Sequence, residues 1–215
     1  MHHLRDYQIQ AIDNLREVFS QGFKKALLVA PTGSGKTVIA SSLIQQAVEK
    51  GSKVLFVAHR RELIMQCSNK LHDFGVNHGV LMADKSPNPL ASCQVASIQT
   101  FTARVDRDDF IKPEADLIII DEAHRSASDS FKNLLREYPN AYVIGRSPLA
   151  GDIPSSGQLD RYVVMERQSS LPDRLRVQHY VSPSSRRNRC LTRIPSAESF
   201  FSEGPLEEAQ REITA

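Results

Sequence analysis

Two patterns of apolar residues alternate over the first 145 residues of the chain: short uninterrupted apolar runs, and stretches with a helical spacing of apolar residues. Between the apolar runs, hydrophobic residues recur at intervals of three and four, the spacing that predicts helices. Apolar runs without polar alternation, separated by helices, indicate a parallel sheet that is covered on both faces. The pattern predicts a three-layer α/β domain over residues 1–145, with strands at 25–30, 53–58, 78–83, 93–98, 115–120 and 141–145.

Four stretches carry the helical spacing. The first places Ile12, Leu15 and Phe19 on one face and ends at Gly22. The other three begin after apolar runs or acidic segments and end at a glycine or a proline, residues that terminate helices. They cover 37–50, the stretch from Ile64 to Phe74, and the stretch from Phe131 to Tyr138.

From Arg146 onward this pattern stops. Residues 151–215 contain nine arginines, ten serines and no lysine, whereas the first 150 residues contain nine arginines and nine lysines. Polar segments that are rich in helix- and strand-breaking residues do not bury enough apolar surface to fold. Residues 146–215 are therefore expected to form an irregular tail, with one short helix over 205–213.

Composition narrows the class of protein but does not indicate a function. The chain has 215 residues, 40% of them hydrophobic and 24% charged, with a net charge of +2. This charge is too small to indicate a polyanionic partner by itself. The start of the chain lacks a signal-peptide pattern, and no apolar run is long enough for a membrane span, so we expect a cytoplasmic protein without membrane contact.

The three cysteines, Cys67, Cys93 and Cys190, are isolated in the sequence and odd in number. Their spacing does not match that of a metal site. We therefore interpret them as packing residues of a protein in a reducing compartment.

The segment APTGSGKT, residues 30–37, connects an apolar run to a predicted helix. Phosphate binding requires main-chain N–H groups that approach an anion closely, a cation, and a helix N-terminus. Gly33 and Gly35 permit the close approach. Lys36 is placed to reach the β- and γ-phosphates, and the hydroxyl of Thr37 is a candidate Mg²⁺ ligand. A glycine-serine turn with a chance lysine is the weaker alternative, although Ala30 stands where the strict pattern has glycine.

The segment LIIIDEAH, residues 117–124, places two carboxylates after another apolar run. Nucleotide hydrolysis needs one carboxylate near the metal and a second group that orients water. Asp121 is the candidate metal ligand, and Glu122 is the candidate acceptor of a proton from the attacking water. An isolated acidic pair after a strand usually belongs to a solvated loop. Two halves of one site in the right order favour a nucleotide site instead.

Together, PTGSGKT and DEAH resemble motifs I and II of superfamily 2 helicases and translocases of the DEAD/DEAH-box class. The chain is most similar to the bacterial group related to type III restriction (Res) subunits and RadD-type DNA-repair helicases. The resemblance covers residues 4–145 and implies the first RecA-like domain of a P-loop NTPase, with ATP and Mg²⁺ as cofactors.

This resemblance also implies roles for individual residues. The segment LRDYQIQAI, residues 4–12, is similar to the adenine-recognition segment of the group, with Gln8 as the residue that reads adenine. Further nucleotide contacts are implied for Thr32, Gly33, Ser34, Gly35, Lys36 and Thr37. Catalytic roles are implied for Lys36, Asp121, Glu122 and His124.

Two more segments look like motifs Ia and Ib of this class, namely VAHRRELIMQ (57–66) and VASIQTF (95–101). In the class, these loops hold the sugar-phosphate backbone, a contact that does not depend on base sequence. Adjacent arginines are also common at the solvated start of a helix, which is the alternative for Arg60 and Arg61. The resemblance implies nucleic-acid contacts, with DNA favoured over RNA, from His59, Arg60, Arg61, Ser97, Gln99 and Thr100.

The resemblance ends at VIGRSPLAGDIP, residues 143–154, where the family has a Ser/Thr-Ala-Thr motif that couples hydrolysis to movement. The second RecA-like domain and its arginine finger are absent as well. One hypothesis is a frameshift near the codon of Gly145. A diverged extension or an artificial boundary is the rival interpretation. The shortened sheet is expected to expose an edge and to leave the isolated chain marginally stable.

Three functions remain open at this point. The first is the ATP-binding domain of a truncated DNA helicase or translocase, poorly active alone because an arginine finger contributes a factor of ~10³–10⁵ in rate. The second is a non-catalytic module that binds nucleotide or nucleic acid and acts with a partner supplying the second RecA-like domain. The third, an unrelated P-loop NTPase such as a kinase, is disfavoured by DEAH and the segment around Gln8.

Overall fold

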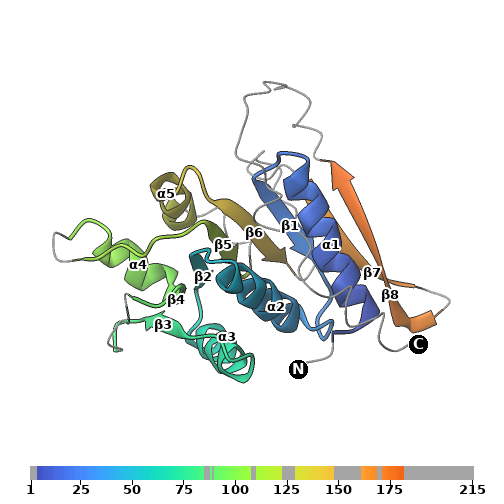
Figure 1. Ribbon diagram of the computed structural model, residues 1–215, viewed down its shortest axis with the longest axis horizontal. Helices are drawn as coiled ribbons and strands as arrows, with labels where there is room; N and C mark the ends of the chain where they lie inside the picture. The colour runs from blue at the N-terminus through green and yellow to red at the C-terminus, as the bar shows by residue number, and fades with distance from the viewer. Residues whose placement is uncertain are drawn as a thin grey trace.

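The computed structural model describes residues 4–84, 88, 90–107, 110–122 and 129–147, with the backbone of 161–168 and 171–181 and the side chain of Val163. The helices are α1 (Asp6–Ser20), α2 (Lys36–Glu49), α3 (Arg61–Asp73), α4 (Ile98–Arg104) and α5 (Asp129–Glu137). The strands are β1 (Lys25–Val29), β2 (Val54–Ala58), β3 (His78–Leu81), β4 (Cys93–Ser97), β5 (Leu117–Ile120), β6 (Tyr142–Ser147), β7 (Arg161–Gln168) and β8 (Leu171–Val181). Figure 1 shows their arrangement.

The strands form one sheet in the order β3-β4-β2-β5-β6-β1-β7-β8. Every pair from β3 to β7 is parallel, and only β8 runs antiparallel to its neighbour. Each of the six apolar runs of the sequence became one of the strands β1 to β6, which confirms the predicted parallel α/β sheet. Because the strands are parallel, their carboxyl ends lie along one edge of the sheet.

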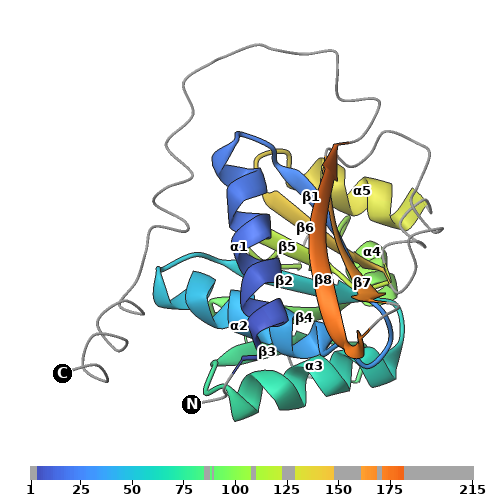
Figure 2. The ribbon, with the colours of Figure 1, turned by 90° about the vertical axis from the view of Figure 1, so that its right-hand side faces the viewer.

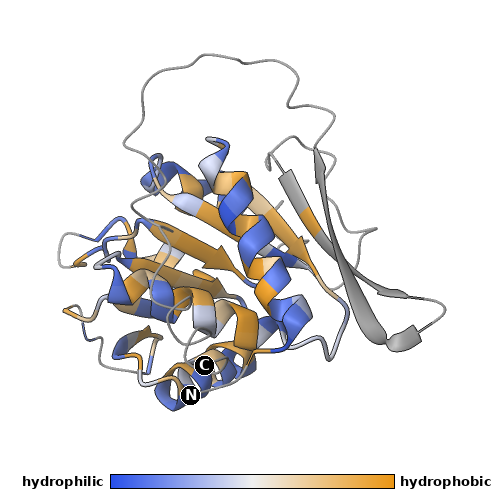
Figure 3. Cartoon of the chain, turned by 45° about the vertical axis from the view of Figure 1, so that its right-hand side comes forward, coloured by the Kyte–Doolittle hydropathy of each residue, from blue (hydrophilic) through white to orange (hydrophobic). Residues whose placement is uncertain are grey.

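The sheet separates two hydrophobic cores, and helices lie on both of its faces (Figure 2). Alternate residues of a strand point to opposite faces, so Ala26 and Leu28 of β1 pack on one side and Leu27 and Val29 on the other. Helices α1, α2 and α3 cover the first face, and α4 and α5 cover the second. Figure 3 shows strands β1 to β6 as mostly hydrophobic and the helices as mixtures of hydrophilic and hydrophobic residues, as a three-layer fold requires.

Helix α4 is the described helix that the hydrophobic pattern did not predict. Ser97 ends β4 and also caps α4, because its Oγ accepts a hydrogen bond from the main-chain N–H of Thr100 at 3.4 Å. The apolar run of residues 93–98 continues into this helix and hides its start. A serine three residues before Thr100 is a capping signal that the sequence did carry.

The tail is not irregular throughout, which corrects the sequence-based expectation for residues 161–181. There β7 pairs with β1 in parallel, with Ala26 opposite Arg161 and Val29 opposite Val164, and β8 folds back on β7. The run Tyr162–Met165 is rich in residues that favour strands, but it is short and its flanks are polar. Its partner is the edge of β1, far earlier in the chain. β7 and β8 therefore extend the sheet beyond β1.

The predicted end of the ordered pattern at Arg146 also needs correction. Strand β6 continues through Arg146 to Ser147, both buried, and Ser147 lies opposite Val29 of β1. The main-chain oxygen of Ser147 accepts a hydrogen bond from the N–H of Ala30 at 3.0 Å. Pairing with β1 thus carries the strand two residues beyond its predicted end at Gly145.

Two of the three cysteines, Cys67 and Cys93, are buried and free, which agrees with a packing role. Cys190 and the helix expected over 205–213 lie outside the described residues. Within the described part of the chain, every helix is too short or too polar to cross a bilayer.

Candidate nucleotide and nucleic-acid site

Five neighbouring strand ends bring the predicted site residues together. In the order β4, β2, β5, β6 and β1, these strands are followed or ended by Gln99, His59, Asp121, Arg146 and the glycine-rich loop. Side-chain contacts connect these ends one after another. We call the connected residues the strand-end row: Gln99, His59, Glu122, Asp121, Arg146 and Thr37.

The glycine-rich loop has the backbone that its sequence predicts. Gly33 and Gly35 have φ angles of 82° and 78°, a left-handed conformation that costs little only for glycine. Gly35 is the N-cap of α2, and its carbonyl oxygen accepts the N–H of Ile39 at 3.0 Å. The loop therefore leads directly into the N-terminus of α2, whose partial positive charge favours an anion.

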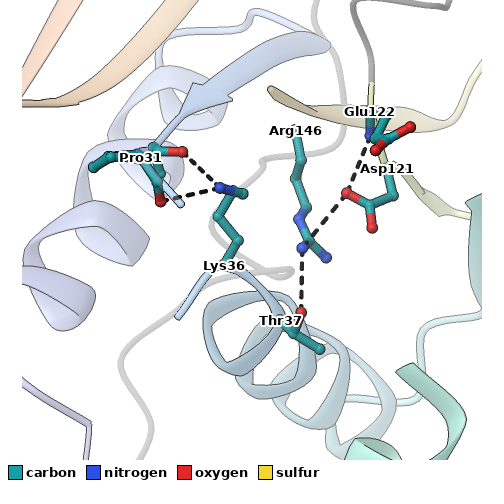
Figure 4. A network of polar contacts seen from close by, with 7 residues as sticks. Pro31, Lys36, Thr37, Asp121, Glu122 and Arg146 are labelled. Atoms are coloured by element: carbon teal, nitrogen blue, oxygen red, sulfur yellow. Dashed lines mark hydrogen bonds and ion pairs between the residues drawn. The ribbon is translucent and has the colours of Figure 1, made fainter. Parts of the chain in front are cut away.

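Lys36 lies in the first turn of α2 with its side chain folded over this loop. Its Nζ donates hydrogen bonds to the main-chain oxygens of Ala30 at 2.7 Å and Pro31 at 3.0 Å (Figure 4). Burial lowers the pKa of Lys36 below its usual range, the positive charge of Arg146 lowers it further, and Asp121 opposes both. An anion in the loop would relieve the repulsion between the two cations.

Gln8 joins the N-terminal segment to the glycine-rich loop. It is buried in α1, where its Oε1 accepts the N–H of Arg5 at 3.0 Å. Its Nε2 donates to the main-chain oxygen of Ser34 at 3.3 Å. A Cβ added at Gly35 would collide with that same Nε2. The structure thus places the predicted adenine-reading residue against the predicted phosphate loop.

The acidic pair lies at the end of β5. Asp121 is buried, and its Oδ1 accepts the main-chain N–H of Glu122 at 3.0 Å. Glu122 has a φ of 53°, a strained value for a residue with a side chain. This backbone turn directs Asp121 and Glu122 to different neighbours in the strand-end row. His124 lies outside the described residues.

Arg146 occupies the space between the two predicted metal ligands (Figure 4). Its Nη2 lies 3.4 Å from Thr37 Oγ1 and 3.5 Å from Asp121 Oδ1. Arg146 is only 3% exposed, and its guanidinium carbon lies 5.7 Å from the ring centroid of Phe56. The sequence did not single out Arg146 as a site residue, because it marks the point where the family pattern stops.

The residues present do not fit a resident Mg²⁺ ion while Arg146 holds this position. Magnesium requires near-octahedral oxygen ligands at about 2.1 Å. Here Thr37 and Asp121 instead share one nitrogen of a guanidinium cation, which takes the place of a metal ion between them. Among the described residues, no cluster of three His, Cys, Asp or Glu side chains offers another metal site.

His59 connects the acidic pair to the next strand ends. Its Nε2 lies 3.2 Å from Glu122 Oε2, and its main-chain oxygen accepts a hydrogen bond from Gln99 Nε2 at 3.1 Å. Gln99 is exposed, and its Oε1 accepts the hydroxyl of Ser97 at 2.8 Å. The predicted motif Ia and Ib residues therefore lie beside each other and beside Glu122.

The remaining predicted nucleic-acid residues lie around this point. Arg60 is exposed and donates from Nε to His59 Nε2 at 3.2 Å. Arg61 is exposed in the first turn of α3, but it pairs with Asp84 at 2.8 Å. Thr100 is half-buried in α4 and uses its N–H in the helix cap. Arg61 is thus partly neutralised and directed toward the loop after β3.

Comparisons with known proteins identify the family of this chain. Residues 1–147 match the family described as type III restriction enzyme, res subunit. IRC3 of Saccharomyces cerevisiae, whose name describes an ATP-dependent helicase, is 33% identical in an alignment of 161 positions that covers 69% of this chain. The type I restriction enzyme EcoAI endonuclease subunit of Escherichia coli is 33% identical in an alignment of 151 positions that covers 66% of this chain. This chain covers only 23% and 18% of those two proteins.

Solved structures show the same fold. The Hef helicase domain of Pyrococcus furiosus matches 70% of this chain and 34% of its own, with a TM-score of 0.58 and 28% identity. The SWI2/SNF2 ATPase core of Sulfolobus solfataricus, solved with dsDNA, matches 70% of this chain and 34% of its own. Its TM-score is 0.55 at 18% identity, a likeness of fold alone. From the family match, the helicase relatives and the parallel sheet, we conclude that the chain belongs to the ResIII family of superfamily 2 helicases and has its RecA-like fold.

Proposed function

We propose that this chain is the ATP-binding domain of a DNA helicase or translocase, and that by itself it binds ATP without sustained hydrolysis. The observation that carries the proposal is the strand-end row. In it, the glycine-rich loop, the acidic pair and the predicted nucleic-acid residues follow one another along a single edge of the sheet. Ligands of open α/β sheets bind at this edge.

Binding of ATP is supported by the loop after β1. Two left-handed glycines, the N-terminus of α2 and Lys36 converge there, and each of these features favours a phosphate. Gln8 is held beside the loop by its hydrogen bond to Ser34, which supports its proposed role as the residue that contacts the base. The ATP-dependent helicases of the family use the same cofactor.

Binding of DNA is supported by the other end of the row. Gln99 is exposed after β4, and Arg60 is exposed after β2, so both can contact a sugar-phosphate backbone. Such contacts position a strand without reading its bases. The relative solved with dsDNA has the same fold, which makes DNA the first partner to test.

Weak hydrolysis is supported by Arg146, which lies where the metal ligands would otherwise meet. In the family pattern, a second RecA-like domain also supplies arginines that stabilise the transition state, and an arginine finger is worth ~10³–10⁵ in rate. Arg146 specifically favours the second candidate function, a non-catalytic module that acts with a partner carrying a second RecA-like domain.

Calorimetric titration of the purified chain with ATP tests the first step. We expect saturable binding that Lys36→Ala abolishes, while Lys50→Ala, at the exposed end of the same helix, leaves binding unchanged. Absence of ATP binding by the wild-type chain would refute the proposal. Rapid turnover by the chain alone would refute the claim that it is inactive by itself.

A fluorescence-anisotropy titration with a labelled single-stranded oligonucleotide tests the second step. We expect binding that weakens with rising salt, as for any backbone contact. Gln99→Ala should weaken it further, whereas Gln21→Ala, exposed at the far end of α1, should not. Adding the second RecA-like domain of a relative in trans tests whether ATP turnover can be restored. Equal affinities of both variants would remove Gln99 from the proposed DNA contact.

The frameshift hypothesis can be tested on the coding DNA. The family match ends at residue 147, close to the codon of Gly145 where the motif is interrupted. If the hypothesis is correct, one alternate reading frame past this codon encodes Thr-Ala-Thr followed by helicase-like sequence. If neither frame does, the rival interpretations remain: residues beyond 147 are a diverged extension, or the family sequence was cut at an artificial boundary.

A further inference from the structure

Arg146 is a buried cation whose hydrogen-bonding capacity is only partly used. One of its nitrogens, Nη2, contacts Thr37 and Asp121. Its other two, Nε and Nη1, are buried and lack a hydrogen-bond partner among the described residues. Leaving donors of a charged group unpaired in a protein interior is costly. A buried guanidinium with free donors therefore points to an anion that completes its bonding.

The surroundings identify that anion as a phosphate. The nearest neighbour on α2, Thr37, directly follows Lys36 and the glycine-rich loop. Arg146 lowers the pKa of Lys36 by repulsion, so the two cations share one electrostatic environment. Among the described residues, Asp121 supplies the one carboxylate that contacts the guanidinium, while Glu122 pairs with His59, so Lys36 and Arg146 together outnumber the carboxylate between them. Guanidinium groups bind phosphate oxygens through two parallel hydrogen bonds.

We propose that Arg146 replaces the metal ion of this site, so that the chain binds the phosphates of a free nucleotide and does not require Mg²⁺. The inference rests on the proposed nucleotide binding and specifies its ligand. In P-loop proteins, a metal bridges the β- and γ-phosphate oxygens and neutralises their charge. Here a covalently attached cation lies between Thr37 and Asp121, the two residues that would hold that metal.

The position of Arg146 is well defined, as a built-in counter-ion requires. It lies in β6, which is paired with β5 on one side and β1 on the other. The ring of Phe56, in β2, packs against the guanidinium. Strand pairing and the aromatic ring both restrict Arg146. Its guanidinium therefore cannot move into solvent without losing its contacts with Phe56, Thr37 and Asp121.

The test compares ATP binding in two buffers of equal ionic strength, one with excess EDTA and one with excess MgCl₂. For the wild-type chain we expect dissociation constants that differ by less than about threefold. A wild-type affinity at least tenfold higher with MgCl₂ would overturn the role of Arg146 and leave the proposed nucleotide binding intact. No binding in either buffer would overturn both. This comparison needs no variant and therefore does not depend on a variant folding.

Variants then locate the effect. Arg146→Leu should weaken binding in EDTA by about 10- to 100-fold, the loss expected for hydrogen bonds to a charged group. With the cation removed, MgCl₂ should restore affinity, so the variant becomes magnesium-dependent. Arg136→Leu, an exposed arginine on α5, is the matched control and should behave as the wild type. An Arg146→Leu chain that folds and still binds equally in both buffers would overturn the assignment.

Discussion

The Nε2 of His59 lies 3.2 Å from the Oε2 of Glu122, although the two residues follow different strands, β2 and β5. The main-chain oxygen of the same histidine accepts a hydrogen bond from Gln99. One residue therefore contacts both the predicted catalytic carboxylate and the predicted nucleic-acid loop. Any displacement of Gln99 by a bound strand would be transmitted to Glu122 through two contacts.

His59 is predicted to couple DNA binding to nucleotide binding. We expect DNA to change the ATP dissociation constant of the wild-type chain by about fivefold, a typical coupling between sites. In His59→Ala this factor should fall toward one. Gln99 keeps its hydrogen bond to the main-chain oxygen of residue 59, but the side-chain contact with Glu122 is lost. Calorimetric titrations with and without a saturating oligonucleotide measure it. His72→Ala, an exposed histidine on α3, is the control, and equal coupling in both variants would contradict the prediction.

Gly35 is predicted to be much less replaceable than Gly22. Both have a positive φ, 78° and 87°, but an added Cβ at Gly22 meets open space, whereas at Gly35 it meets Gln8. Gly22→Ala should cost about 1 kcal/mol for the backbone alone. Gly35→Ala should cost about 1 kcal/mol more, because the added Cβ displaces the Gln8 amide from its hydrogen bond to Ser34.

Urea unfolding of the two glycine variants measures the difference. Combining Gly35→Ala with Gln8→Ala should recover the part of the loss that arises from the collision and leave the backbone part. Equal destabilisation in Gly22→Ala and Gly35→Ala would mean that Gln8 does not lie against the loop in solution.

The buried thiols are predicted to be unreactive in the folded chain. Burial raises the pKa of Cys67 to about 12, and burial likewise raises that of Cys93. Because the thiolate is the reactive form, a disulfide reagent at pH 8 should modify these thiols only as fast as the chain unfolds. The assay uses a Cys190→Ser background, in which only these two thiols remain. Fast modification without denaturant would contradict the burial of both side chains.

The same shifts predict a loss of stability at alkaline pH. In the unfolded chain the thiols release their protons near 9, whereas Cys67 keeps its proton in the folded chain until about 12. The folded state thus binds more protons above pH 9, and the free energy of unfolding should fall as pH rises. Tyr138, whose pKa burial also raises, acts in the same direction above its ordinary value of 10. A variant with Cys67→Ala and Cys93→Ala should show a shallower decline, and an unchanged slope would contradict the assignment.

Val163 tests whether the strand after the predicted boundary pairs with β1 in solution. Its side chain is fully buried in the core under α1. Val163→Asp places an unpaired charge there and should destabilise the chain by about 3 kcal/mol or more, measured by urea unfolding. Val163→Ile keeps the apolar character and serves as the control. If the aspartate variant is as stable as the wild type, residues 161–168 do not form part of the folded sheet.

The sequence by itself was sufficient for the regular part of the fold. Uninterrupted apolar runs and helical spacing are local signals, and they predicted the strands from β1 to β6 and the helices α1, α2, α3 and α5. The glycine-rich loop and the acidic pair were also readable, since Gly35 and Asp121 belong to short motifs adjacent to those strands. The start of α4 was missed because the apolar run before it continues into the helix.

Only the tertiary structure decided which strand ends are neighbours, because the order of strands in a parallel sheet depends on pairing between distant segments. That order places Arg146 between Thr37 and Asp121, and His59 beside Glu122. It also gives β1 a partner in β7, whose composition indicated an irregular tail. In the sequence, Arg146 interrupts a family motif. In the folded chain, the pairing of β6 with β5 and β1 places the same residue at the centre of the candidate site.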